Sequence, residues 1–131
     1  GGVDDVWIKT DGEFIIVDYK ATSKNDEITL DADWQIGYKR QMEIYQWLFR
    51  KNGFQVSSTG YFVYCNGDAN KAIFDGRLEF DVKIISYIGD DSWVENTVAA
   101  AIECLKEATL PLANEDCDYC KYRQAVKIFE Q

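Results

Sequence analysis

FIIVDYK, residues 14–20, is the stretch from which the architecture of this chain follows. Four apolar residues in succession predict a strand that is buried on both faces, because a half-exposed strand would alternate apolar and polar residues. The run ends in Asp18, Tyr19 and Lys20. A carboxylate in this setting is costly to bury unless it is paired with a cation or bound to a metal. Asp18 is therefore the first candidate for a functional residue.

A second β-rich stretch, Val3 to Lys9, precedes this strand. The turn residues Thr10-Asp11-Gly12 separate the two, so residues 3–9 and 13–20 are predicted to form an antiparallel hairpin. Asp4 and Asp18 lie about equally far from the turn. We therefore expect their side chains to sit side by side, as cross-strand neighbours about 5 Å apart.

Two carboxylates at that separation repel each other, and a divalent cation such as Mg²⁺ relieves the repulsion because it prefers hard oxygen ligands. Lys20 lies two residues after Asp18, so both side chains are expected on one face of the strand. A lysine ammonium there can orient an attacking water or stabilise transition-state charge, which suits phosphodiester hydrolysis. The alternative interpretation is a simple salt bridge between Asp18 and Lys20 beside a solvated Asp4.

The residues that follow predict alternating helices and strands. Residues 21–33 are polar and are interpreted as a loop, and residues 34–51 have helical spacing, with Asn52-Gly53 as a helix stop. Strands are predicted over residues 54–65 and 77–87. The apolar stripe expected to face the sheet consists of Trp34, Tyr38, Gln41, Tyr45 and Leu48.

Ser92 and Glu95 fit a capping box, which predicts the start of a second helix. Its inward residues are expected to be Val94, Val98, Ile102 and Leu105. The order of strand, strand, helix, strand, strand, helix predicts an α/β fold with a mixed β-sheet flanked by helices.

The length, composition and charge of the chain limit the classes of protein to which it can belong. The 131 residues are 47% hydrophobic and contain no linker or repeat, which favours one domain over residues 1–131. No apolar stretch or signal segment suggests a membrane, so a cytoplasmic protein is expected. The absence of histidine from the sequence removes Ser-His and Cys-His chemistry. The formal net charge of -9 argues against binding nucleic acid through bulk charge, and leaves a local patch, with candidates Lys39, Arg40, Arg50 and Lys51.

Three motifs follow one another along the chain. Gly1-Gly2-Val3-Asp4 matches G-x-x-D, residues 14–20 match an apolar strand ending in D-x-K, and residues 41–45 match Q-x-x-x-Y on the following helix. In this order and spacing, the chain resembles the RecB-like branch of the PD-(D/E)XK nuclease superfamily, mainly over residues 1–65. The resemblance implies a restriction-endonuclease-like fold.

The resemblance also implies a function. Asp4, Asp18 and the backbone carbonyl of Tyr19 would bind Mg²⁺ or Mn²⁺, and Lys20 would be catalytic. Gln41 and Tyr45 would support the site or touch DNA; at i and i+4 they share a helix face, and Gln41 is expected to need a polar partner. The implied activity is a deoxyribonuclease, exonuclease or endonuclease, in recombination, repair or phage DNA processing.

Two alternatives remain open. The family tends to supply a further acidic residue from a helix upstream of G-x-x-D, and these 131 residues contain no such segment. Its absence and the acidic net charge favour a second hypothesis, a non-catalytic module of the same fold that binds DNA or protein. A third is an unrelated α/β domain in which the D-x-K motif is accidental.

Cys117 and Cys120 have the C-x-x-C spacing of a metal knuckle. Some RecB-like nucleases hold an iron–sulfur cluster with one upstream cysteine and three near the C-terminus. Here the ligand set is incomplete unless Cys104 or Cys65 joins it, and a structural zinc is possible on the same terms. Two reduced thiols are an equally good interpretation.

Overall fold

A computed structural model describes residues 2–70 and 76–129. Its centre is a four-stranded sheet in the order β1-β2-β3-β4. The β1–β2 and β3–β4 pairs are antiparallel, and the β2–β3 pair is parallel. The predicted α/β class with a mixed sheet is confirmed. The strands are β1 (Asp5–Ile8), β2 (Phe14–Thr22), β3 (Thr59–Gly67) and β4 (Phe80–Ile88).

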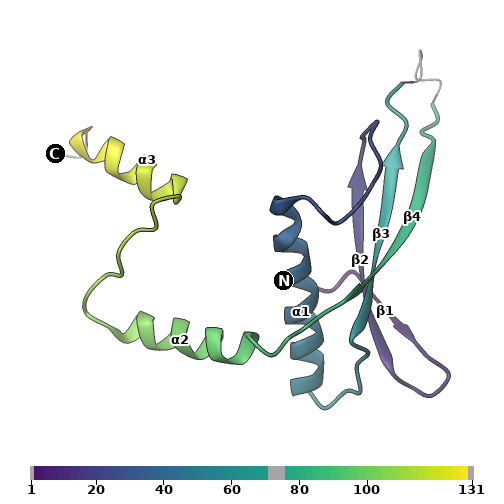
Figure 1. Ribbon diagram of the computed structural model, residues 1–131, viewed down its shortest axis with the longest axis horizontal. Coiled ribbons are helices and arrows are strands. Elements are labelled where there is room, and N and C mark those ends of the chain that lie inside the picture. The colour runs from purple at the N-terminus through teal and green to yellow at the C-terminus, as the bar shows by residue number, and fades with distance from the viewer. Residues whose placement is uncertain (1, 71–75, 130–131) are drawn as a thin grey trace. The chain divides into compact units, whose positions relative to one another are not determined.

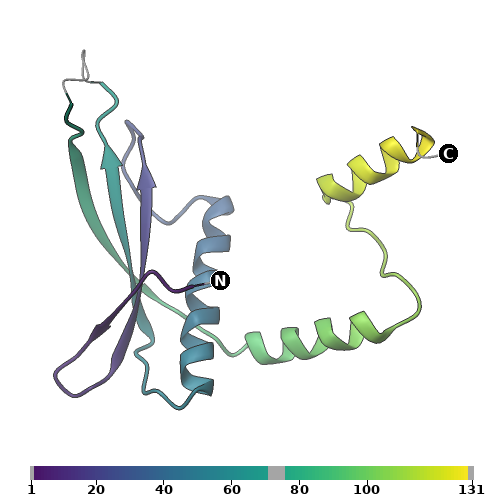
Figure 2. The same ribbon diagram turned by 180° about the vertical axis from the view of Figure 1, so that it is seen from behind.

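Helix α1 (Ile36–Lys51) connects β2 to β3, because a parallel pair needs a crossover connection. A single 3-10 turn, η1 (Asp33–Gln35), leads into it. Figures 1 and 2 show α1 lying alongside the sheet. The predicted helix stop is confirmed, since Gly53 has a φ of 86° directly after the C-cap residue Asn52.

The chain divides into two compact units, residues 1–95 and 96–131. The first holds the sheet and α1. The second holds most of α2 (Val94–Lys106), then α3 (Asp118–Val126) and η2 (Lys127–Phe129). One domain over residues 1–131 stays a prediction. None of the helices in residues 2–70 and 76–129 has the length and hydropathy that a bilayer span requires.

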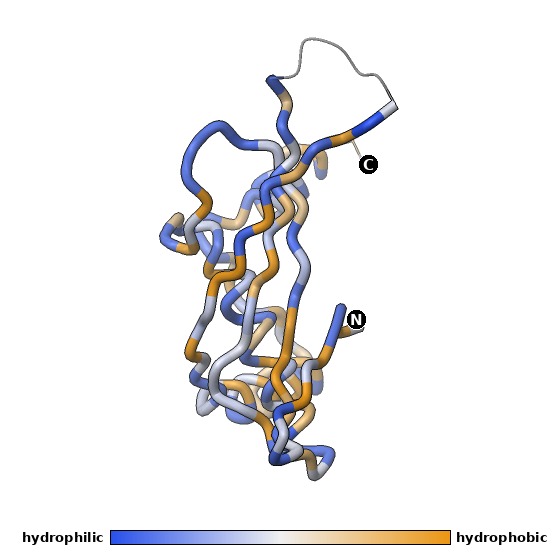
Figure 3. The backbone as a smooth tube through the Cα atoms, turned by 90° about the vertical axis from the view of Figure 1, so that its right-hand side faces the viewer, coloured by the Kyte–Doolittle hydropathy of each residue, from blue (hydrophilic) through white to orange (hydrophobic). Residues whose placement is uncertain are grey.

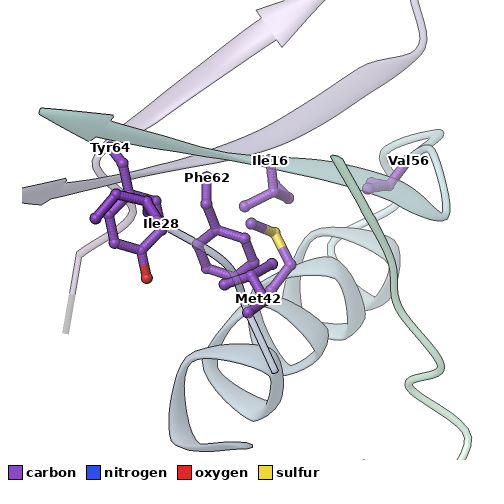
Figure 4. Packing of buried hydrophobic residues seen from close by; sticks show 7 residues of the cluster. Ile16, Ile28, Met42, Val56, Phe62 and Tyr64 are labelled. Atoms are coloured by element: carbon purple, nitrogen blue, oxygen red, sulfur yellow. The ribbon is translucent and has the colours of Figure 1, made fainter. Parts of the chain in front are cut away.

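The core of the first unit lies between the sheet and α1. Figure 4 shows Phe62 and Ile16 projecting from β3 and β2 toward Met42 of the helix. All three side chains are fully buried. In Figure 3 the hydrophobic segments run largely along the strands, and the loops that join them are more hydrophilic. The remaining members of the cluster are Ile28, Leu30, Val56 and Tyr64.

Replacing Phe62 by alanine is expected to lower the free energy of unfolding by about 3–5 kcal/mol, because the change removes a fully buried ring and leaves a cavity. Urea denaturation measures the loss. Ile8→Ala is the matched control, since Ile8 is a strand residue that is 64% exposed, and it should change stability by less than about 0.5 kcal/mol. Equal losses in the two variants would contradict this core assignment.

The predicted sheet-facing stripe of residues 34–51 is correct in part: Tyr38 and Tyr45 pack against the core, but the centre of the contact lies about one residue away. The buried residues of the helix are Met42, Glu43 and Gln46, whereas Trp34 and Leu48 are exposed. One residue rotates a helix by about 100°, so Tyr38, Gln41 and Tyr45 lie at the margin of the contact. The error arose because two of the three buried positions carry polar side chains, which hydrophobic spacing does not detect.

Val94, the first of the residues expected on the inner face of the second helix, is buried. The inward placement of Val98, Ile102 and Leu105, which belong to the second unit, stays a prediction. One further prediction needs correction. The strand predicted over residues 54–65 begins only at Thr59, because the preceding loop makes a single bridge between Val56 and Phe14.

Glu43 is a buried carboxylate that fixes the end of β4 against α1. Its Oε1 accepts hydrogen bonds from the Tyr87 hydroxyl at 2.6 Å and the Asp90 amide at 3.2 Å. Its Oε2 accepts one from Trp93 Nε1 at 2.7 Å. Nearby, Arg50 Nη1 lies 2.5 Å from an Asp91 carboxylate oxygen. These polar contacts explain why a glutamate occupies a core position.

Burial, together with the hydrogen bond to Glu43, raises the pKa of Tyr87 to about 12 from its usual 10. The folded protein therefore keeps this proton when the unfolded chain has lost it. The resulting stability is fully present below pH 10 and is lost as the pH rises from 10 toward 12. Tyr87→Phe should flatten the fall in unfolding free energy over this range, measured by urea denaturation. Tyr122→Phe, at an exposed position, should keep the wild-type slope; the same flattening in both variants would contradict the assignment.

Candidate active site

The β1–β2 hairpin brings the two predicted acidic residues together. Asp5 pairs with Val17 in the sheet, so the next positions outward are Asp4 and Asp18. Asp4 Oδ2 also accepts a hydrogen bond from the Tyr19 amide at 2.9 Å. The register agrees with the placement expected from the turn. Gly1, the first residue of the G-x-x-D motif, lies outside the described residues.

Asp18 is a buried carboxylate with an unusual environment. It is 2% exposed, and Lys20 Nζ lies 2.5 Å from its Oδ2. The Lys20 ammonium is thus within hydrogen-bonding distance of this oxygen. Burial raises the pKa of Asp18 above its usual value, the Lys20 ammonium opposes that shift, and the neighbouring Asp4 adds to it. A buried carboxylate beside a second carboxylate is an arrangement that a further cation would stabilise.

Lys20 is held by side chains of α1. Gln41 Oε1 accepts a hydrogen bond from its ammonium at 3.2 Å, and the ammonium lies 4.2 Å from the centre of the Tyr38 ring. Gln41 Nε2 donates to the Tyr45 hydroxyl at 3.1 Å, which in turn donates to the Gly2 carbonyl at 2.9 Å. Gln41 therefore has the polar partner that it was expected to need. This chain of contacts joins the helix, β2 and the segment before β1.

Tyr38 contacts Lys20, but the sequence pattern assigned it only to the apolar stripe. The available signal was its spacing, three residues before Gln41 and hence on the same side of the helix. Tyr19 points to the other face of β2, where its hydroxyl donates to Asp5 at 2.8 Å. The Tyr19 amide faces Asp4, and its carbonyl lies on the same edge of the strand, because both groups of one extended residue point the same way.

Two carboxylates and a backbone carbonyl are hard oxygen donors, the type that Mg²⁺ and Mn²⁺ prefer. Mg²⁺ commonly uses one or two protein carboxylates and keeps several waters. Within residues 2–70 and 76–129, no three acidic, cysteine or histidine side chains gather in one place. The residues present thus fit a water-rich hard-cation site with two carboxylates.

Two of the four cations proposed for a DNA-binding patch are engaged elsewhere. Arg50 pairs with Asp91, and Lys51 Nζ lies 2.6 Å from a Glu95 carboxylate oxygen. Both cations are therefore largely neutralised by carboxylates. Lys39 and Arg40 remain as the candidates for such a patch.

Cys117 and Cys120 lie together at the start of α3, with their sulfur atoms 2.6 Å apart. Cys117 is the N-cap residue, and its sulfur accepts a hydrogen bond from the Cys120 amide. Contact with the Cys120 thiol lowers the pKa of Cys117. The part of the chain that the structure describes supplies no third ligand beside them. A zinc ion or iron–sulfur cluster would need further ligands.

The mixed sheet and the crossover helix define an α/β domain consistent with the restriction-endonuclease-like fold. The family model of the PD-(D/E)XK nuclease superfamily matches residues 1–125, and the chain belongs to this superfamily. No curated protein and no solved structure shows a significant match.

Proposed function

We propose that this chain is a divalent-metal-dependent nuclease that hydrolyses phosphodiester bonds of DNA. The observation that carries the proposal is the buried Asp18 carboxylate, which lies beside Asp4 and forms an ion pair with Lys20. Family membership supports the same reaction class. Asp4, Asp18 and the Tyr19 carbonyl are the proposed ligands of Mg²⁺ or Mn²⁺.

A bound metal would supply Lewis-acid activation of the phosphate and a more acidic water. Lys20 is the proposed catalytic residue, because its ammonium has three N–H donors. One faces Asp18 and one faces Gln41. On substrate binding, the ammonium would also contact a phosphate oxygen or the attacking water, whose developing charge it would stabilise.

Gln41 and Tyr45 are proposed positioning residues rather than catalytic ones. Their hydrogen bonds join Lys20 to the Gly2 carbonyl and so hold the helix, the strand and the segment carrying Asp4 in one arrangement. Small displacements of a catalytic group are costly in rate. Their role is to keep the lysine and the acids at a fixed separation.

The proposed branch of the superfamily and the proposed biological role rest on the order of the motifs. G-x-x-D, D-x-K and Q-x-x-x-Y in succession support the RecB-like branch, and with it a role in recombination, repair or phage DNA processing. DNA is the proposed partner, and the proposed compartment is the cytoplasm.

The test is DNA cleavage by the full-length protein that carries this chain. Linear single-stranded, linear duplex and circular DNA are incubated with Mg²⁺ or Mn²⁺, and parallel reactions contain EDTA. We expect at least one form to be cleaved only with metal. A folded protein that cleaves none of them would overturn the proposal.

A non-catalytic module of the same fold is the second candidate. It is favoured by the gathering of no more than two acidic side chains at the site among the described residues. Calorimetric titration with Mn²⁺ separates the two candidates. Saturable binding that requires Asp18 supports the nuclease, whereas DNA binding without metal binding supports the module.

A further inference from the structure

A cavity of about 220 Å³ adjoins Lys20, between the end of β2, the following loop and the start of α1. Its lining includes Gln35 and Tyr64, which are each 4% exposed. Gln35 Nε2 donates to the Tyr64 hydroxyl at 3.3 Å. Typical small-molecule sites measure about 300–1,000 Å³. The cavity therefore suits a single ring system rather than a whole cofactor.

Two aromatic side chains form one side of this cavity. Trp34 is 56% exposed. Its ring meets that of Tyr38 edge-on, with centroids 5.4 Å apart and an interplanar angle of 83°. Much of the Trp34 side chain is therefore in contact with solvent. Exposed aromatic faces next to a nuclease site are suited to stacking on nucleic-acid bases.

A lysine ammonium also lies over each of the two rings. Lys20 Nζ lies 4.2 Å from the Tyr38 centroid, and Lys24 Nζ lies 4.9 Å from the Trp34 centroid. Aromatic rings interleaved with cations are typical of surfaces that follow a single strand, because the rings stack on bases while the cations contact phosphates. The same cavity therefore offers both kinds of contact beside the proposed catalytic lysine.

Two acidic residues at the cavity restrict the direction of a bound strand. Glu27 Oε1 is engaged by Lys83 Nζ at 2.9 Å. Asp26 also lines the cavity and disfavours a phosphate close to it. The backbone of a bound strand is consequently expected along Lys20 and Lys24, with a base directed toward Trp34.

We infer that Trp34, with Tyr38 and Lys24, forms a subsite that stacks on one unpaired DNA base beside Lys20, and so favours single-stranded DNA over intact duplex. An interior base of a duplex has both faces covered by its neighbours, so it cannot stack on a protein ring without being unpaired. The inference rests on the proposed nuclease function, because it gives the subsite the task of placing a strand at the metal site.

The experiment measures binding in EDTA, so that it does not depend on cleavage. The full-length protein is titrated into a single-stranded oligonucleotide that contains 2-aminopurine, and into a blunt duplex of the same sequence. Wild-type protein should bind the single strand more tightly and quench the fluorescent base. Trp34→Ala should weaken single-strand binding about tenfold or more and lose the quenching. Trp34→Phe should retain most of both, because it keeps a ring.

Phe54→Ala is the control, since Phe54 is a partly exposed aromatic outside the cavity; it should bind like wild type. The subsite would be overturned if wild-type protein failed to bind the single strand. It would also be overturned if Trp34→Ala bound the single strand as tightly as wild type, or if it lost affinity equally for the single strand and the duplex. If wild type cleaves DNA with metal but Trp34→Ala behaves as wild type, the subsite alone fails. If Trp34-dependent quenching occurs without metal-dependent cleavage, the nuclease function fails and the base-binding subsite stands.

Discussion

Replacing Lys20 by alanine is expected to slow metal-dependent DNA cleavage by about 10²–10³-fold, the usual effect of removing one donor that stabilises transition-state charge. The ammonium sits between Asp18 and Gln41, against the Tyr38 ring. It is therefore already oriented before DNA binds, and its loss cannot be compensated by another side chain in the same place. The effect should fall on the rate of the chemical step.

Single-turnover cleavage at saturating protein and Mn²⁺ measures this step directly. Lys9→Ala is the matched control, because Lys9 belongs to the same hairpin but contacts Glu13 near the turn. It should cleave at the wild-type rate. Equal rates for the Lys20 and Lys9 variants would remove Lys20 from the proposed mechanism, provided that circular dichroism shows both proteins to be folded.

Replacing Asp18 by asparagine is expected to abolish metal binding and cleavage together. The amide keeps the shape of the side chain but removes the negative charge that binds a hard cation. Without metal, the variant should remain folded, because burial already disfavours the charged form of Asp18 and raises its pKa. Lys20 also keeps its contacts with Gln41 and Tyr38 when the ion pair is lost.

Thermal denaturation with and without Mn²⁺ tests this expectation. A metal present at about 100 times its dissociation constant should stabilise the wild type by about 2.7 kcal/mol, and the Asp18 variant should gain nothing. Asp11→Asn changes an acidic residue in the turn of the same hairpin and should retain the full metal effect. Stabilisation of Asp18→Asn to the wild-type extent would show that the metal binds elsewhere.

The parts of the fold that depend on local sequence could be predicted. The turn at residues 10–12 contains Gly12 with a φ of 86°, and counting outward from it gives the pairing that places Asp4 beside Asp18. The spacing of Asp18 and Lys20 gives their shared face for the same reason. Alternate side chains of a strand point to the same face, so this placement can be predicted without information about the rest of the molecule.

The parts that depend on long-range contacts could not be predicted. Glu43 is buried because Tyr87 and Trp93, more than forty residues later, donate hydrogen bonds to it. Hydrophobic spacing therefore placed the helix face about one residue away from its actual contact. The role of Tyr38 likewise depends on Lys20, which reaches it from the neighbouring strand.

The most direct test of the site is the dependence of the cleavage rate on Mn²⁺ concentration, compared with a calorimetric Mn²⁺ titration of the same full-length protein. If Asp4, Asp18 and Lys20 form one metal-dependent centre, the rate rises with the same midpoint as binding, and Asp18→Asn abolishes both curves. Cleavage that persists in EDTA, or that survives in Asp18→Asn, would contradict the assignment of this centre.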